Sequence, residues 1–353
     1  MIKQQLTLAT LALLSGLSAC GGGGNSTPAA ATLPATPAAA SPTQNTTTPT
    51  FSYDKILGEY PAQQWDVLAL AKILDSSSSL NGEYIQDMTT SLTENGQSYN
   101  ITATGQSNGN INLDYNWNIN TDGTDTQVAI FDSSGFQVAN NYQQTLSDGT
   151  LRVSIDDTTW LASQGVEYVA GAAAQVTYNG DDPIHTLPII YGDFTESGDI
   201  KTTGTQDFAI TPDMLFEYWE NDRSVSTTLA AKGSGTLTID YASSMVSGSI
   251  LLDTFYDYAQ VLSGSSTYSQ VAGIPSITMT LVNGALDGSQ IMATLDTSVV
   301  VTSNGTISGE GYLRGALFGP EGNEVAASLF VLQDNADTHS YFYWDTIGLI
   351  LGR

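Results

Sequence analysis

The chain contains little cysteine, histidine or positive charge. Its 353 residues include one Cys, two His and 9 Lys+Arg against 36 Asp+Glu, so the formal net charge is −27. A single cysteine excludes an intrachain disulfide, and packing alone must hold the fold. The negative charge repels phosphate backbones, which excludes nucleic acid as a partner. A structural zinc site needs about four closely spaced Cys or His ligands, and the sequence offers no such set.

Beyond its first twenty residues the sequence also lacks an apolar run of about 18 residues, so no transmembrane helix is predicted. The start predicts an export signal over residues 1–19, with Lys3 ahead of a short apolar stretch. The residues Leu17-Ser-Ala-Cys20 resemble a bacterial lipobox, which implies cleavage before Cys20 and acylation of this cysteine. Acyl chains would hold the protein on a membrane. Gly21 after the cysteine, by resemblance to Gram-negative lipoproteins, implies the outer membrane.

Residues 20–50 predict a lipid anchor followed by a tether. Four consecutive glycines precede a stretch of Pro, Ala, Ser and Thr without any charged residue. Glycine makes such a segment flexible, and proline stiffens it into extended backbone. The tether implies a folded part of about 300 residues that stands off from the membrane.

The folded part shows the pattern of β-structure. The clearest segment is Asn110–Asn120, in which apolar and polar residues alternate as in a half-buried antiparallel strand. Asn-Gly and Asp-Gly pairs, typical of tight hairpin turns, recur along the chain. The Asn-Gly pairs begin at Asn81, Asn95, Asn108, Asn179, Asn283 and Asn304, and the Asp-Gly pairs begin at Asp122, Asp148 and Asp287.

Further strand candidates lie between the turns, each a short run of β-branched, aromatic or alternating apolar residues. They are Val128–Phe131, Leu151–Ile155, Val166–Val169, Val176–Tyr178, Leu237–Tyr241, Ile250–Leu252, Ile277–Leu281, Ile291–Leu295, Val299–Val301 and Leu329–Leu332. One helix is predicted, from Pro61 to Leu74, because Trp65, Leu68, Ala69 and Ile73 share a helical face.

Strands at this spacing joined by tight turns indicate a sandwich or a barrel. We therefore predict an all-β protein. An N-terminal β-rich, handle-like domain is expected over residues 51–185, followed by a closed antiparallel barrel of about eight strands over residues 186–353.

The last 160 or so residues carry a resemblance to a known family. The segments are Lys232–Tyr241 with Val246–Ile250, the related pair over residues 277–295, Phe318-Gly-Pro-Glu-Gly-Asn-Glu-Val-Ala-Ala327, and the ending Ile347-Gly-Leu-Ile-Leu-Gly-Arg353. They are similar to the C-terminal barrel of the transferrin-binding protein B family, which also includes factor H-binding protein-type lipoproteins. The resemblance implies that a Gly-Pro turn joins two late strands and that a Gly-rich strand closes the barrel.

Catalytic patterns are sparse. Gly105-Gln-Ser-Asn-Gly109 has the spacing of a nucleophile elbow, which needs a strand before Ser107 and a helix after it. Here an Asn-Gly pair leads straight into an alternating strand, so a hairpin turn accounts for the residues. We assign no catalytic residue, no metal ligand and no cofactor. A hydrolase or carbohydrate-active enzyme is kept as an alternative, to be recognised by turnover of an ester or glycan.

Four aromatic or imidazole side chains are the candidates for ligand binding. Trp219 lies in Met214–Trp219, and Tyr256 and Tyr258 lie in Phe255–Tyr258. Aromatic residues are rigid anchors at binding surfaces, although core packing is the competing interpretation of both segments. His339 lies just ahead of four consecutive aromatic residues and could bind haem as a ligand, with packing in a late strand as the alternative.

These features predict a lipid-anchored outer-membrane protein, exposed at the cell surface, that binds rather than catalyses. By resemblance, its partner is a host protein, haem or another solute taken up for iron or nutrient acquisition, with hand-over to an outer-membrane receptor. An adhesin or a binder of immune regulators on the same scaffold is the alternative, since one fold hosts several functions. The resemblance transfers no transferrin-contact residue to this chain.

Overall fold

The fold is known from a computed structural model, which describes residues 50–56, 63–74, 83–85, 88–106, 112–132, 136–179, 184–220, 225–264, 268–301, 305–333 and 342–353. The chain divides into two compact units, Met1–Thr48 and Pro49–Arg353, and all of the described residues lie in the second. Among them, no helix combines the length and the apolar character needed to cross a membrane. The predicted export signal, the tether up to residue 49 and the turns at Asn81, Asn108 and Asn304 lie outside the described residues.

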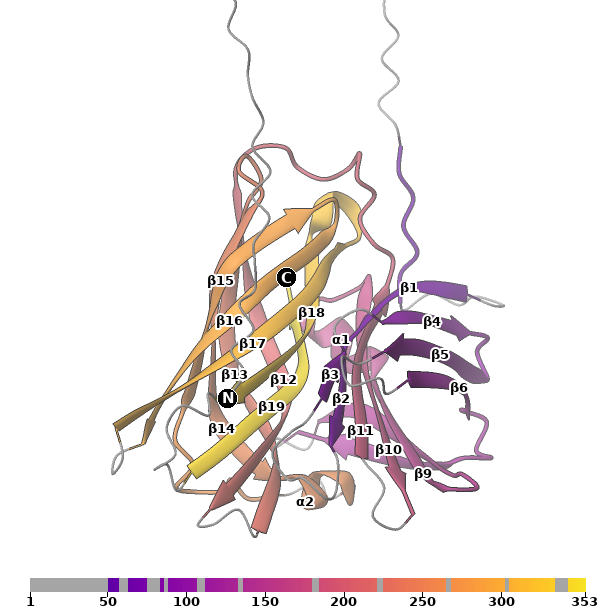
Figure 1. The fold of residues 1–353 in the computed structure, drawn as a ribbon. Coiled ribbons are helices and arrows are strands. Elements are labelled where there is room, and N and C mark those ends of the chain that lie inside the picture. The colour runs from indigo at the N-terminus through magenta and orange to yellow at the C-terminus, as the bar shows by residue number, and fades with distance from the viewer. Residues whose placement is uncertain are drawn as a thin grey trace, which may run out of the picture. The chain divides into compact units, whose positions relative to one another are not determined.

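The first half of the described chain forms a curled antiparallel sheet, drawn in indigo to magenta in Figure 1. Its strand order is β6-β5-β4-β1-β11-β10-β9-β8-β7, with β2 paired to β11 and β3 paired to β2. The strands are β1 (Gln63–Ala69), β2 (Ala71–Leu74), β3 (Glu83–Ile85), β4 (Thr89–Glu94), β5 (Ser98–Gln106), β6 (Asn112–Asn120), β7 (Thr126–Phe131), β8 (Gln137–Thr145), β9 (Gly149–Asp156), β10 (Val169–Tyr178) and β11 (Ile184–Gly192), with helix α1 (Thr158–Gln164) between β9 and β10.

The second half forms a closed barrel, in which the last strand pairs with the first. This confirms the predicted all-β class and the predicted eight-stranded antiparallel barrel. The strands are β12 (Thr205–Glu220), β13 (Val225–Asp240), β14 (Met245–Asp257), β15 (Ile277–Asp287), β16 (Gln290–Val301), β17 (Gly305–Phe318), β18 (Glu324–Gln333) and β19 (Phe342–Gly352), with the short helix α2 (Tyr258–Leu262) after β14 and a 3-10 turn (Pro320–Gly322) before β18.

Alternation in the sequence explains how these strands pack. In β6 the side chains of Leu113, Tyr115, Trp117 and Ile119 are buried, whereas Asp114 and the asparagines between them are exposed. The apolar face joins the core of the sheet, and the polar face meets water. The barrel has its own core, built from inward-facing side chains of its strands. The expected Gly-Pro turn joins β17 to β18.

The predicted helix over Pro61–Leu74 is wrong, because the described residues of this segment form β1 and β2. Strand β1 lies between β4 and β11, and Leu68 through Ala71 are all buried. A strand that is covered on both faces has consecutive apolar residues instead of alternating ones. Periodicity alone does not distinguish such a run from a buried helical segment.

Two smaller predictions are also corrected. Val166–Val169 is not a strand throughout, since β10 begins at Val169. Asn283 does not begin a hairpin turn but lies inside β15, where the pairing register shifts between Val282 and Ala285. Its φ of 53° is the left-handed conformation that asparagine tolerates, so the residue type is suited to a β-bulge as well as to a turn.

Hydrogen bonds join the sheet to the barrel. The buried carboxylate of Glu324 in β18 accepts from the backbone N–H groups of Glu167 (2.7 Å) and Tyr168 (2.9 Å), ahead of β10. The Ser328 hydroxyl donates to the Pro188 carbonyl (3.3 Å). Burial raises the pKa of Glu324, and the two N–H donors oppose this rise. Because these groups are buried and paired, the contact between sheet and barrel is specific.

Candidate functional site

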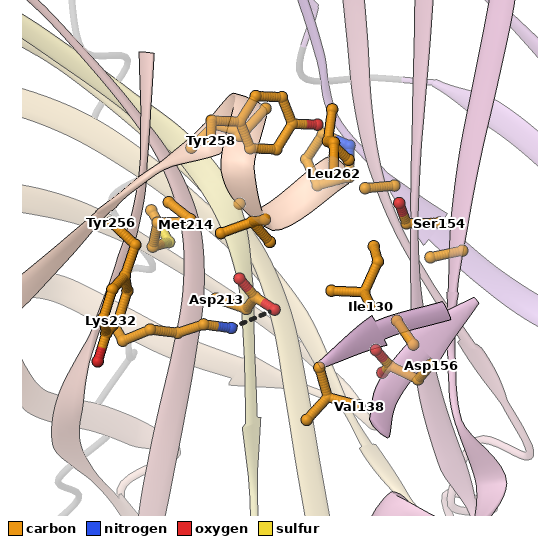
Figure 2. A pocket seen from close by; sticks show the side chains of 18 of the residues that line it. Ile130, Val138, Ser154, Asp156, Asp213, Met214, Lys232, Tyr256, Tyr258 and Leu262 are labelled. Atoms are coloured by element: carbon orange, nitrogen blue, oxygen red, sulfur yellow. Dashed lines mark ion pairs between the residues drawn. The ribbon is translucent and has the colours of Figure 1, made fainter. Parts of the chain in front are cut away.

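A cavity of about 110 Å³ lies between the sheet, the barrel and helix α2. On the sheet side its walls come from β7 to β11, and on the barrel side from β12 to β14 and β19. Figure 2 shows the side chains that point into it, including Ile130 and Val138 from the sheet and Met214 from the barrel. The volume exceeds that of one ordered water several times over, so the space can hold a small organic molecule.

Small residues create this space. Strand β10 contains the run Val169-Ala-Gly-Ala-Ala-Ala174, and Ala172 and Ala173 line the cavity together with Ala139 and Ala230. Gly348 on β19 completes the barrel side, where a Cβ atom would lie 2.6 Å from the Met214 Cα. Larger side chains at these positions would fill the gap that separates the sheet from the barrel.

Tyrosines form one wall. Tyr256 at the end of β14 and Tyr258 at the start of α2 line the cavity with Tyr268 from the following loop. The rings of Tyr256 and Tyr268 meet edge to face with centroids 4.9 Å apart. The Tyr268 hydroxyl donates to the Phe131 carbonyl (2.6 Å), and burial raises its pKa to about 12. This wall is therefore held in place by a hydrogen bond to the sheet.

Three charged side chains reach the cavity. Asp213 on β12 and Lys232 on β13 are paired in the strand register, and their side chains form an ion pair of 2.6 Å (Figure 2). Lys232 directly precedes a register shift at Gly233, where a Cβ atom would clash with the Leu251 carbonyl oxygen. The close approach requires glycine, and the extra residue of this β-bulge is Asp253 on β14.

Asp156 is the charged group of the opposite wall. It ends β9, is half-buried, and accepts from the Gly171 N–H (2.7 Å). Burial raises the pKa of its carboxyl group to about 7; the Gly171 N–H and Lys232 lower it, whereas Asp213 and Asp157 raise it. A carboxyl group with such a pKa changes its charge near neutral pH, which is typical of functional sites.

A polar hollow lies on the other side of α2. Tyr258 and Leu262 line both spaces, so this short helix separates them. The hollow is lined from the sheet by amide, hydroxyl and guanidinium side chains, among them Asn141, Gln143 and Arg152. It is more open than the cavity and offers hydrogen-bonding groups where the cavity offers apolar ones.

Some predicted site residues lie at this cavity. Tyr256 and Tyr258 both line it, which places them together as the sequence grouping suggested, while their role in binding stays a prediction. Trp219 lies in β12, but its side chain is outside the described residues. His339 and Cys20 fall outside them too, as does Ser107. Within the described segments, no cluster of three or more His, Cys, Asp or Glu residues is arranged to hold a metal ion.

Sequence reasoning missed Asp156 and the Asp213–Lys232 pair. Asp156 follows Leu151–Ile155 on the polar face of an alternating strand, where a carboxylate normally meets solvent. The one available signal was the alanine run in β10, because small side chains on a sheet face mark a close approach or a space.

No protein-family model matches the sequence, and no curated protein sequence matches it. Similar solved structures include intact Ap-TbpB with its N and C lobes (8% identity, TM-score 0.37, 80% of this chain and 64% of that one). They also include a double mutant of transferrin-binding protein B from Haemophilus parasuis Hp5, with 9% identity, a TM-score of 0.35, and coverage of 83% of this chain and 76% of that one. The isotype 1 protein from serogroup B Neisseria meningitidis has 9% identity, a TM-score of 0.32, and coverage of 76% of this chain and 52% of that one.

The chain thus spans less than two thirds of the first of these structures. By their names these neighbours bind transferrin.

Proposed function

We propose that this chain is an outer-membrane lipoprotein, anchored through Cys20 and facing outward, that captures a small solute for iron or nutrient acquisition. The observation that carries the proposal is the preformed cavity, lined by tyrosines and apolar side chains and holding a few charged groups. Binding sites for small molecules have this composition. The lipobox and the tether support the anchored position.

The hydrogen bonds between sheet and barrel support capture without large rearrangement. Glu324 and Ser328 fix the barrel to the sheet, and Tyr268 fixes the tyrosine wall to β7. A site that is already ordered loses little conformational entropy when a ligand binds, which favours affinity.

The test is capture from growth medium and serum by the Pro49–Arg353 unit, within which every described strand pairing lies. Bound solutes are released by denaturation and identified by mass spectrometry, with haem read by its absorbance. The comparison variant is Ala173→Phe, which fills the cavity, and the control is Ser234→Phe on an exposed part of β13. Loss of the solute from Ala173→Phe alone supports the proposal. Equal retention by both variants would place binding elsewhere and refute solute capture in this cavity.

Capture of a host protein is a second candidate function, favoured by an exposed apolar face of the barrel. Met245 and Met292 are 61% and 41% exposed, and each is paired in register with Ala285 on the strand between them. Val282 on the same strand is 38% exposed. Methionine is common at protein-binding surfaces because its side chain adapts to the partner. The net charge of −27 favours a partner with a basic surface.

The second candidate is tested with Met245→Glu/Met292→Glu in the same serum capture. We expect the double variant to lose a retained protein that the wild type and Ala173→Phe both retain. Thr236→Glu, at another exposed position of β13, is the matched control. Retention of the same protein by the double variant would refute this face as its binding surface.

A further inference from the structure

The walls of the cavity limit the size and the polarity of a ligand. Apolar side chains from both sides enclose the space, and the three tyrosines add aromatic surface. A volume of about 110 Å³ is comparable to that of an apolar cavity that takes one benzene molecule, so the ligand body is roughly one aromatic ring or a short branched chain. A ligand made mainly of polar groups would lose its hydration here without replacing it.

The charged side chains of the walls determine which charge a ligand's polar group should carry. Lys232 already has a partner in Asp213, so these two opposite charges largely offset one another. Asp156 lies on the opposite wall and accepts one backbone hydrogen bond, from Gly171. Counting these three groups in their ionised forms, the lining carries a formal charge of −1 from Asp156 and Asp213 against Lys232.

We propose that the cavity takes a small organic cation, a protonated amine on an aromatic or branched aliphatic body. Its ammonium group lies against Asp156, and its body packs on the tyrosine wall and Met214. The inference rests on the proposed function, because it names the chemical class of the captured solute. The faces of tyrosine rings attract cations, so the aromatic wall and the carboxylate favour the same ligand.

Anions and neutral ligands fit less well. An anion would meet Asp156 and Asp213, and its attraction to Lys232 would compete with an ion pair of 2.6 Å. A neutral ligand would gain no charge-assisted hydrogen bond from Asp156. The groups that face Asp156 are Asp213 from β12, Lys232 from β13 and Asp157 beside it, with the tyrosines of β14, α2 and the next loop on the cavity wall.

The experiment measures binding of three related probes to the Pro49–Arg353 unit by calorimetry. The probes are 2-phenylethylamine, 2-phenylethanol and 3-phenylpropionate, which share a ring and differ in charge. At pH 8 we expect the amine to bind at least about tenfold tighter than the alcohol, as a charge-assisted hydrogen bond provides. Asp156→Asn should reduce this preference to about twofold, and Asp253→Asn, an exposed control on β14, should leave it unchanged.

The pH dependence provides a second readout. With a pKa of about 7, Asp156 is roughly nine-tenths ionised at pH 8 and one-tenth ionised at pH 6. The amine stays protonated across this range, so its affinity for the wild type should fall about threefold from pH 8 to pH 6, because the uncharged carboxyl group keeps the weaker binding expected of Asp156→Asn. In Asp156→Asn the affinity should not depend on pH.

The outcomes separate this inference from the proposed function. Equal binding of amine and alcohol, or an amine affinity unchanged by Asp156→Asn, overturns the cation inference and leaves the cavity as a solute site. Tighter binding of 3-phenylpropionate also overturns it. If Ala173→Phe abolishes capture from medium while Asp156→Asn leaves the amount of captured solute unchanged, the proposed function stands and the cation inference falls. If Ala173→Phe changes neither capture nor probe binding, both fall.

Discussion

Substitution of Asp156 by Asn should stabilise the unliganded protein above neutral pH. Burial raises the pKa of the carboxyl group from its ordinary value of 3.8 to about 7. The folded state then binds a proton that the unfolded state has lost, so stability is present below about pH 4 and falls as the pH rises to about 7. At about 1.4 kcal/mol per pKa unit, the difference of roughly three units corresponds to ~4 kcal/mol.

An asparagine at this position removes the ionisation and keeps an oxygen that can accept from the Gly171 N–H. We therefore expect the Asp156→Asn variant to be ~2–4 kcal/mol more stable than the wild type at pH 8, and equal to it near pH 4. For a unit of this size that is a rise in Tm of roughly 4–8 °C.

The assay is thermal unfolding of the Pro49–Arg353 unit at pH 8 and pH 4, followed by near-ultraviolet circular dichroism. The exposed Asp253→Asn should melt with the wild type at both pH values. An unchanged Tm of Asp156→Asn at pH 8 would refute the reasoning, as would a stabilisation of the same size at pH 4. A carboxylate that lowers stability in the resting protein is consistent with retention for ligand binding.

Three further substitutions test the fold. Glu324→Ala should destabilise the protein by ~2–4 kcal/mol in urea unfolding, because two backbone N–H groups lose a buried acceptor, and a loss below ~1 kcal/mol would contradict this. Gly233→Ala should cost a similar ~2–4 kcal/mol, since its Cβ atom would clash with a carbonyl oxygen of β14, while Ser234→Ala should be neutral in the same assay. His185 is buried in β11, and burial lowers the pKa of its imidazole to about 4. In the Asp156→Asn background, His185→Phe should therefore abolish the fall in Tm between about pH 6.5 and pH 4, and a fall that persists would assign the acid sensitivity to another group.

The fold was largely predictable because its strands and hairpin turns are determined by patterns among residues that are close in sequence. Alternation such as that in β6, and Asn-Gly or Asp-Gly pairs such as Asp148-Gly149, depend on neighbouring residues and indicate strands and hairpins directly. The helix prediction failed where local pattern is ambiguous. Leu68 to Ala71 are buried on both faces only because the sheet and the barrel cover β1 from two sides, which the segment itself does not reveal.

The site was predictable only in part, because it combines residues that are distant in sequence. Tyr256 and Tyr258 stand out in the sequence as an aromatic group, and they line the cavity. Asp156 resembles any solvated carboxylate at the end of a strand, and Lys232 any surface lysine, until the barrel is placed against the sheet. Tertiary packing partly shields these groups from water, and the chemistry of the site follows from that packing.

Two titratable groups, the buried His185 and the half-buried Asp156, have opposite effects on how stability depends on pH. Burial lowers the pKa of His185 from 6.5 to about 4, so its stability contribution is lost as the pH falls through this window, by ~3 kcal/mol. Asp156 changes the free energy of unfolding by a similar amount but in the opposite direction, because its contribution is lost as the pH rises from about 4 to about 7. The stability of the wild type should therefore depend little on pH between pH 4 and pH 6.5. Asp156→Asn should lose stability on acidification, His185→Phe should lose it as the pH rises, and the double variant should again be nearly flat, because residues without a shared partner contribute additively.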